Sequence, residues 1–250
     1  TIKENMKNKK LLAVMVVFLF AATLLFLKNE TVAQQKEAAM AKAIADYLVA
    51  GRSVIAKNQP LFNDASKGDK GFTPAVYEAQ VSEELKGKGI DLKAQNAADP
   101  VGKTMLQAHE SAMEVVAEAQ PQINEAGKAF KGFIPAVYGA RTGDRFFKKS
   151  GIRLKQTSLK FRGDYNRPDE FEEGMLKKME SGWERGKPHS EETTAGGRKV
   201  LRYMLPVYIV KPCLPCHGDP AGELDIAGRA KEGYKEGDVR GAISVTVPIR

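Results

Sequence analysis

The chain has 250 residues with a formal net charge of +8, and 42% of its residues are hydrophobic and 28% charged. This composition is that of a folded protein, and the length suits one ordinary domain with an appended helical segment. We expect no nucleic-acid partner, because lysines and arginines are scattered among acids and no helix-turn-helix or zinc-finger spacing occurs. Only two cysteines are present, Cys213 and Cys216. This number excludes a disulfide framework.

The N-terminal segment, residues 1–33, is predicted to be a membrane anchor or a signal segment. Lysines among residues 7–10 precede an uninterrupted apolar run from Leu11 to Leu27. A basic flank before such a run is typical of an export signal. We favour an uncleaved anchor, with cleavage after Ala33 as the alternative. The expected localisation is the cell membrane, single-pass, with the rest of the chain in the periplasm or otherwise outside the cytoplasm.

Helices are predicted after this segment. Residues 34–56 are dominated by Ala, Glu, Lys and Gln, and apolar residues recur there at helical spacing. A second helix is predicted over residues 104–119, and residues 93–103 between them are expected to be a connection. We therefore expect a helical segment over residues 34–103 and one further domain over residues 104–250.

An internal repeat links these two parts. Residues 59–64, 71–77 and 89–93 read QPLFND, GFTPAVY and GIDLK, and residues 120–125, 132–138 and 151–155 read QPQINE, GFIPAVY and GIRLK. Each copy is predicted to contain a helix, a QPxxN turn, a GFxPAVY segment and a GIxLK strand. Only the second copy continues into the remainder of the chain.

The second half of the chain is predicted to be rich in strands. Strands are expected over residues 152–154, 159–161, 199–210 and 241–249, and a helix is expected over residues 168–183. Helices first, followed by strands around a helix, indicate an α+β fold with an antiparallel sheet.

A short motif carries the chemistry. Residues 212–218 read PCLPCHG and contain C-x-x-C-H, the haem-attachment pattern. Two thiols add to the two vinyl groups of one porphyrin, and the imidazole of the next residue reaches the iron from the same side. The motif therefore predicts one covalent haem c, held by Cys213 and Cys216, with His217 as an axial iron ligand.

Three other kinds of site contain a cysteine pair at short spacing. A redox-active C-x-x-C requires a thioredoxin-like βαβ context, which the chain lacks. A zinc site needs a fourth ligand, and neither His109 nor His189 lies at finger spacing. A structural disulfide across two intervening residues is the weakest of the three. Haem attachment is favoured over all three.

Further residues resemble a known family in combination with the motif. They are Thr157, Ser158, Arg162, Asn166, Pro168, Asp169, Phe171, Glu172, Pro206, Val207, Gly241, Ser244 and Pro248. From about Met105 to Ile249 the chain resembles single-haem c-type proteins with a PAS-like fold, found in cyanobacteria and many anaerobic bacteria, which also supply periplasmic sensor domains. Gly163 and Asp164 depart from the family's Asn-Pro. The expected fold class is α+β, a PAS-like antiparallel sheet with long N-terminal helices, preceded by one transmembrane helix.

The distal side of the haem departs from this family. Val116 stands where the family has a cysteine that ligates the iron, and valine has no ligating atom. The sixth position is then open or filled from elsewhere. His109 and Met113 share a helical face with Val116 and are candidate metal ligands, although packing also explains a methionine there. Arg162 is a candidate partner of a haem propionate, because a guanidinium binds carboxylates bidentately; a surface role explains it equally.

Two functions are compatible with these features. The first is a membrane-anchored extracytoplasmic monohaem c-type cytochrome in single-electron transfer with redox partner proteins. The second is a haem-based redox or gas sensor domain that signals through its N-terminal membrane helix. Electron transfer is favoured because no kinase follows the last strand. We expect no enzymatic activity, since no distal acid–base pair is evident; peroxide or nitrogen-oxide chemistry at an open haem is the alternative. Expected partners are redox proteins and the membrane, and a homo-oligomer or a subunit of a membrane complex is compatible with the sequence.

Overall fold

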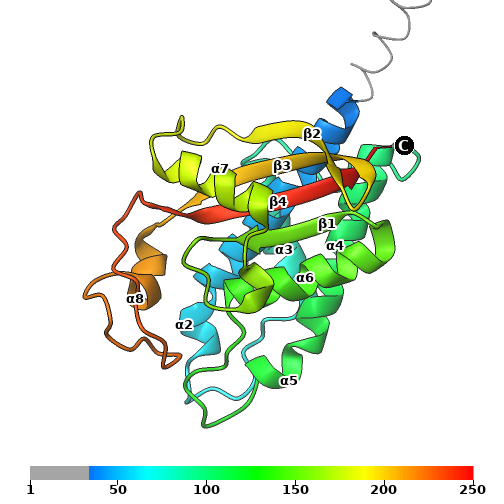
Figure 1. Cartoon of the computed structure of the whole chain (residues 1–250). Coiled ribbons are helices and arrows are strands. Elements are labelled where there is room, and N and C mark those ends of the chain that lie inside the picture. Colours follow the sequence, from blue (N-terminus) through cyan, green and yellow to red (C-terminus); the bar gives the residue numbers. More distant parts are fainter. Residues whose placement is uncertain (1–33, 250) are drawn as a thin grey trace, which may run out of the picture.

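The computed structural model describes residues 34–249 (Figure 1). The predicted anchor or signal segment, residues 1–33, lies outside the described residues. Among residues 34–249, none of the helices has both the length and the apolar character needed to span a bilayer. The expected single-pass membrane localisation and the expected transmembrane helix are therefore not supported by the residues that the structure describes.

A four-stranded antiparallel sheet with the order β1-β4-β3-β2 forms the centre of the fold. The strands are β1 (Arg153–Thr157), β2 (His189–Ala195), β3 (Arg198–Tyr208) and β4 (Val239–Pro248). β3 and β4 pair along most of their length, with Leu205 opposite Ile243. The predicted α+β class with an antiparallel sheet is confirmed, and the PAS-like character stays a prediction.

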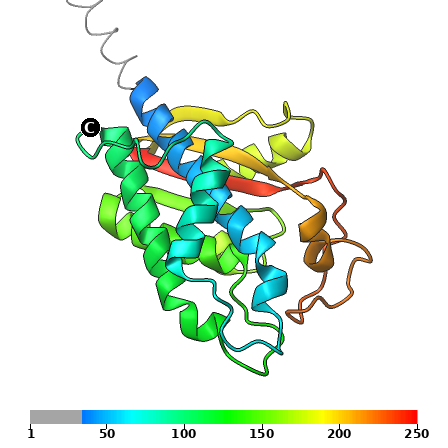
Figure 2. The same cartoon turned by 180° about the vertical axis from the view of Figure 1, so that it is seen from behind.

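Helices lie on both faces of this sheet (Figures 1 and 2). They are a helix over residues 34–57, α2 (Gln59–Phe62), α3 (Pro74–Lys86), α4 (Pro100–Glu118), α5 (Gln120–Ile123), α6 (Pro135–Ser150) and α7 (Glu170–Glu180). The helix over residues 34–57 packs on one face and α7 on the other. Successive strand side chains point to opposite faces. Tyr203 therefore joins the main core with the N-terminal helices, whereas Met204 packs with Leu176 of α7.

The two copies of the repeat bind each other reciprocally. The Asn63 side-chain oxygen accepts a hydrogen bond from the backbone N–H of Lys131 at 3.0 Å, and the Asn124 oxygen accepts one from Lys70 at 2.9 Å. These asparagines follow α2 and α5, so each QPxxN segment is a single helical turn with its proline in the first turn. Equivalent residues of the two copies thus face each other inside one domain.

The predicted helices are confirmed with shifted ends. α4 begins at Pro100, within the predicted connection, because Asp99 caps it by accepting a hydrogen bond from the Gly102 backbone N–H. The strands predicted over residues 89–93 and 159–161 are wrong, since both segments are irregular. Short apolar alternation is not sufficient to form a strand where no partner strand lies alongside.

Some elements carry no clear signal in the sequence. The GFxPAVY segments begin α3 and α6, where each proline occupies the first helical turn. β2 is an edge strand of mostly polar residues, which lacks the apolar alternation of a half-buried strand. His189 is the first residue of β2.

Candidate functional site

The C-x-x-C-H motif lies directly after β3, beside the sheet (Figure 1). A 3-10 turn, η2 (Lys211–Cys213), leads into the single turn of α8 (Leu214–His217). The backbone N–H of Cys213 donates to the carbonyl of Val210 at 2.8 Å and starts this winding. Both cysteines are free and half-buried. The helical turn thus keeps two thiols and one imidazole close together at the surface of the protein.

The ring of His217 is oriented by Glu232. Nδ1 of His217 lies 2.8 Å from Oε2 of Glu232, and the His217 carbonyl accepts a hydrogen bond from the Tyr234 backbone N–H at 2.9 Å. An ionised carboxylate only accepts hydrogen bonds, so Nδ1 carries the proton and Nε2 keeps its lone pair. Burial lowers the pKa of His217, although Glu232 acts in the opposite direction. A neutral imidazole with a free Nε2 is the form that binds iron.

Arg162 joins the motif to the loop that follows it. Its Nε donates to Glu232 and its Nη1 to Asp225, each at 2.5 Å, and its Nη2 donates to the carbonyl of Cys216 at 2.5 Å. A further bond from Nη2 reaches the second carboxylate oxygen of Glu232 at 2.8 Å. The guanidinium therefore holds the loop over residues 218–238 against the backbone of α8.

Of the two carboxylates around Arg162, Asp225 is buried and Glu232 is half-buried, and both are ionised. The side chain of Asp225 is 1% exposed and also accepts hydrogen bonds from the backbone N–H groups of Ala227 and Arg229. Burial alone raises the pKa of Asp225, but these hydrogen bonds and Arg162 outweigh it and lower the pKa. The pKa of Glu232 is lowered in the same way, because Arg162 and His217 outweigh its burial. The motif is thus held by a cluster in which the positive charge of Arg162 neutralises part of the negative charge of Asp225 and Glu232.

The thiols and their surroundings fit a covalent haem. Burial raises the pKa of the Cys216 thiol, and the negative charge of Asp225 acts in the same direction. Cys216 is therefore protonated at neutral pH, and both cysteines are free to form thioether bonds. Large apolar side chains are exposed beside the motif, at Val210, Leu224 and Ile226. Apolar surface with a few placed polar groups suits a porphyrin ring.

Arg52 brings a further cation towards the motif from the helix over residues 34–57. Burial lowers the pKa of Arg52 to about 10, and the charge of Cys213 acts in the opposite direction. Among the described residues, Nε of Arg52 is buried without a hydrogen-bond partner. A buried donor without a partner is costly, so the site suits an anionic group that would bind it. The donor set around the motif therefore also fits a haem propionate.

The candidate distal ligands lie on α4 and have other partners. Nδ1 of His109 lies 3.0 Å from the hydroxyl of Tyr47, and its Nε2 lies 3.6 Å from a carboxylate oxygen of Glu78. Met113 packs against the main core, and Val116 is fully buried in it. The structure brings Arg162 to the motif, whereas the contacts of His109 and Met113 lie elsewhere. Iron ligation by these two residues, and a propionate contact of Arg162, stay predictions.

Sequence reasoning missed the residues that hold the motif. Glu232 and Asp225 lie in an irregular loop with several glycines, and Arg52 lies in a helix where it resembles any other polar residue. Their acidic or basic character was visible in the sequence, but a charged residue is usually a solvated one. Only their tertiary contacts distinguish them: Glu232 and Asp225 bind Arg162, and Arg52 interacts with the charge of Cys213.

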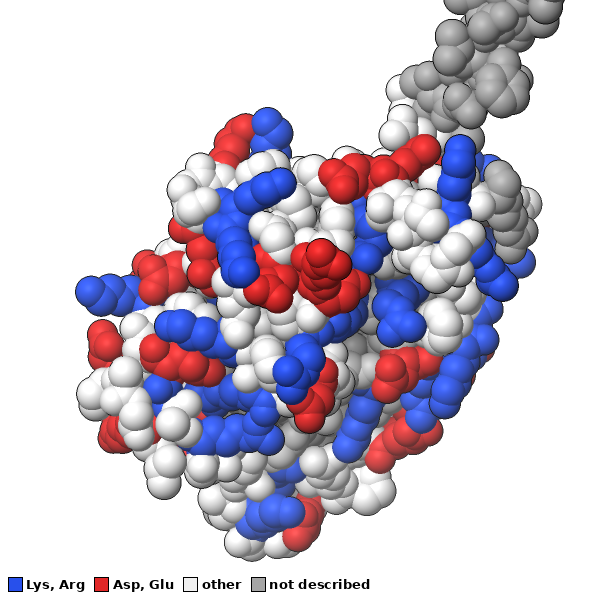
Figure 3. Space-filling view, in the orientation of Figure 1, with Lys and Arg blue, Asp and Glu red and all other residues white. Residues whose placement is uncertain are grey.

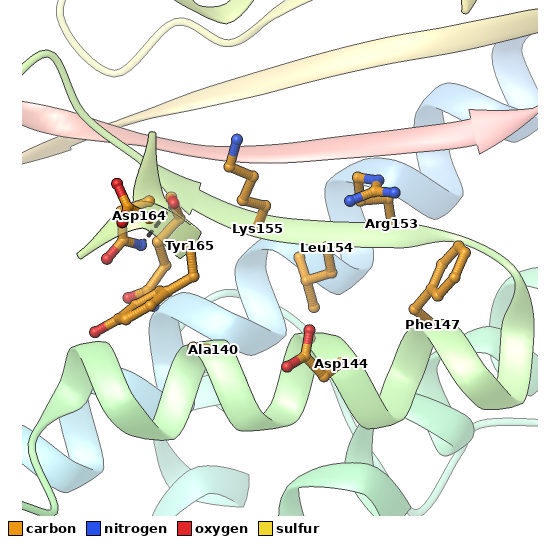
Figure 4. A pocket seen from close by; sticks show the side chains of 11 residues that line it. Ala140, Asp144, Phe147, Arg153, Leu154, Lys155, Asp164 and Tyr165 are labelled. Atoms are coloured by element: carbon orange, nitrogen blue, oxygen red, sulfur yellow. Dashed lines mark hydrogen bonds between the residues drawn. The ribbon is translucent and has the colours of Figure 1, made fainter. Parts of the chain in front are cut away.

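A surface cavity lies at a different place in the fold. About 300 Å³ of space is enclosed between α6, β1 and the 3-10 turn η1 (Asp164–Asn166). Figure 4 shows Asp144 rising from α6 towards β1 and Tyr165 lying over α6. None of the lining residues belongs to the motif or to its charge cluster. On the face of the molecule in Figure 3, basic and acidic side chains are interspersed, as expected for a mixed-charge surface.

Known proteins were compared with the chain. A solved structure, that of the cyanobacterial heme-protein Tll0287, is 17% identical, with a TM-score of 0.41, and the match covers 59% of this chain and 92% of that one. No curated protein matches the chain. The model of the Tll0287-like family matches residues 28–248, which is most of the sequence. The chain therefore belongs to the Tll0287-like family.

Proposed function

We propose that this protein carries one covalent haem c and transfers single electrons. Cys213 and Cys216 would form the two thioether bonds, and Nε2 of His217 would be an axial iron ligand. The observation that carries the proposal is the 2.8 Å contact between Nδ1 of His217 and Glu232, which leaves Nε2 free beside two free thiols. The description of Tll0287 as a heme-protein accords with this assignment.

The residues around the motif would orient the haem and set its charge environment. The haem supplies a centre that accepts and releases one electron. Glu232 holds the proton of His217 at Nδ1 and increases the basicity of the imidazole. Arg162 fixes Glu232 and the backbone of Cys216 in one rigid unit. Arg52, with its buried Nε, would pair a propionate.

The position of the motif favours electron exchange with another protein. The motif lies at the surface, and Leu224 beside it is 67% exposed. Exposed apolar groups next to a redox centre allow a partner protein to bind close to the haem. Weak redox complexes bury only small interfaces. The cluster of Arg162, Asp225 and Glu232 keeps the ligand His217 fixed while the charge of the centre changes. We propose a redox protein as the partner.

Covalent attachment is the property that tests this function. After expression with a c-type maturation system, the haem should stay with the polypeptide in a denaturing gel and during acid–acetone extraction. The double variant Cys213→Ala, Cys216→Ala should lose it, whereas His217→Ala should keep the thioethers and change only the ligand spectrum. The bound haem should also show a reversible one-electron redox titration. Haem that extracts freely from the unsubstituted protein refutes the proposal.

A further inference from the structure

A row of buried hydroxyl groups runs through the main core. The hydroxyl of Tyr138 is hydrogen-bonded to that of Tyr77, which lies 3.2 Å from the hydroxyl of Tyr47. The row ends at His109, where Nδ1 lies 3.0 Å from the Tyr47 hydroxyl. All three tyrosines are fully buried. The four side chains come from four different helices and meet only in the folded protein.

The backbone provides the space for this row at Gly51. A Cβ atom at that position would lie 2.0 Å from the Tyr138 hydroxyl oxygen and 2.6 Å from the Tyr77 hydroxyl oxygen. Atoms of a larger residue would therefore overlap both hydroxyl groups. The helix over residues 34–57 thus passes the tyrosine hydroxyls at a distance that only glycine allows.

The hydrogen-bond direction between Tyr47 and His109 follows from the other ring nitrogen. Nε2 of His109 lies 3.6 Å from the carboxylate of Glu78, a half-exposed group. A carboxylate favours the proton on the nitrogen that faces it, so Nε2 carries the proton and Nδ1 has the lone pair. The Tyr47 hydroxyl therefore donates to Nδ1.

Because Nδ1 of His109 lies 3.0 Å from its hydroxyl, Tyr47 has a proton acceptor that the other two tyrosines of the row lack. Burial raises the pKa of Tyr47 well above its ordinary value, so the phenol does not lose its proton alone. A phenol that loses an electron becomes a strong acid, and its oxidation is easier when a base accepts the proton at the same time. Any hydrogen-bond acceptor would satisfy a structural hydroxyl, but only a base serves an oxidation.

We propose that Tyr47 is a redox-active side chain that gives one electron to a high-potential one-electron oxidant while its hydroxyl proton moves to Nδ1 of His109. The O–H bond of Tyr47 breaks and an N–H bond forms on His109, and the oxidant is reduced by one electron. The products are a neutral phenoxyl radical and an imidazolium ion, which the carboxylate of Glu78 stabilises. Return of one electron and of the same proton restores the phenol. This assignment goes beyond the proposed haem chemistry and does not depend on it. It excludes His109 as an iron ligand, because both ring nitrogens are used by Tyr47 and Glu78.

The test uses the full-length protein and a photogenerated tris(bipyridine)ruthenium(III) oxidant, so that its result is separate from haem attachment. After illumination with persulfate and rapid freezing, electron paramagnetic resonance detects phenoxyl radicals. The phenoxyl-radical signal of Tyr47, present in the spectrum of the unsubstituted protein, should be absent from that of Tyr47→Phe. Tyr165→Phe, which removes a tyrosine that is 53% exposed, should keep this signal. Circular dichroism confirms that each variant is folded.

The role of the base requires a second variant. His109→Gln keeps a hydrogen-bond acceptor for the Tyr47 hydroxyl but offers no basic nitrogen. Oxidation of Tyr47 should become markedly slower in this variant, and the solvent deuterium isotope effect of the unsubstituted protein should disappear. Identical spectra for Tyr47→Phe and the unsubstituted protein overturn the proposal. A rate in His109→Gln equal to that of the unsubstituted protein also overturns it, because the hydrogen bond is then only structural.

Discussion

Arg162 is the residue whose removal should disturb the candidate haem site most. Arg162→Met keeps a long apolar side chain but leaves Asp225 and Glu232 without the guanidinium that joins them. The Asp225 side chain is 1% exposed, so its charge cannot be compensated by water. Removal of one partner of a buried ion pair costs about 3–5 kcal/mol. We expect Arg162→Met to lower the free energy of unfolding by that amount.

Arg167 provides a matched control on the same segment. Its ion pair with Asp164 joins side chains that are 62% and 86% exposed. Exposed pairs contribute roughly 0–1 kcal/mol, so Arg167→Met should change stability little. Urea unfolding of the full chain at neutral pH measures both variants, and a thermal scan should show a midpoint lowered by about 2–4 °C for each kcal/mol. Equal destabilisation in the two variants would refute the reasoning.

The same experiment has a pH dependence with a defined sign. The hydrogen bonds and Arg162 lower the pKa of Asp225 in the folded state. A carboxyl group with a lowered folded pKa contributes stability that is present above its unfolded pKa, about 4, and is lost as the pH falls through the folded value. The difference between the unsubstituted protein and Arg162→Met should therefore be largest at neutral pH and decrease below about pH 4. A difference that grows in acid contradicts the assignment.

Two further predictions concern single contacts. Glu232→Gln removes the negative charge beside Nδ1 of His217, so the reduction potential of the haem should rise, because an anionic partner stabilises the ferric state. Spectroelectrochemical titration measures it, and an unchanged potential would argue against His217 as the ligand. Gly51→Ala places a methyl group 2.0 Å from the Tyr138 hydroxyl and should cost about 1–3 kcal/mol in urea unfolding. A neutral effect would show that the tyrosine row is loosely packed.

Local patterns of the sequence predicted much of the fold. The helix over residues 34–57, the strands β3 and β4, and α7 follow from apolar spacing and from capping residues such as Asp169, whose side chain accepts the Glu172 backbone N–H. The strands predicted at residues 89–93 and 159–161 were wrong, because a few alternating residues become a strand only beside a partner. Pairing is a property of the whole sheet.

The haem-attachment motif could be predicted from the sequence, because its three functional residues are neighbours along the chain. Cys213, Cys216 and His217 are so close in sequence that one helical turn brings them together in any fold. The spacing by itself therefore predicted two thioether bonds and one imidazole ligand. The family resemblance extended the prediction to surrounding positions, and the match of residues 28–248 to the Tll0287-like family agrees with it.

Only the tertiary structure decided which groups orient the motif and which surround His109. Glu232 reaches His217 and Asp225 reaches Arg162 from an irregular loop, where no periodic pattern marks a buried acid. The hydrogen bond between Tyr47 and His109 joins two helices far apart in the sequence. A sequence pattern reports the spacing of residues along one element. A charge cluster or a buried hydrogen bond depends on how separate elements approach, and the packing of the whole core sets that approach.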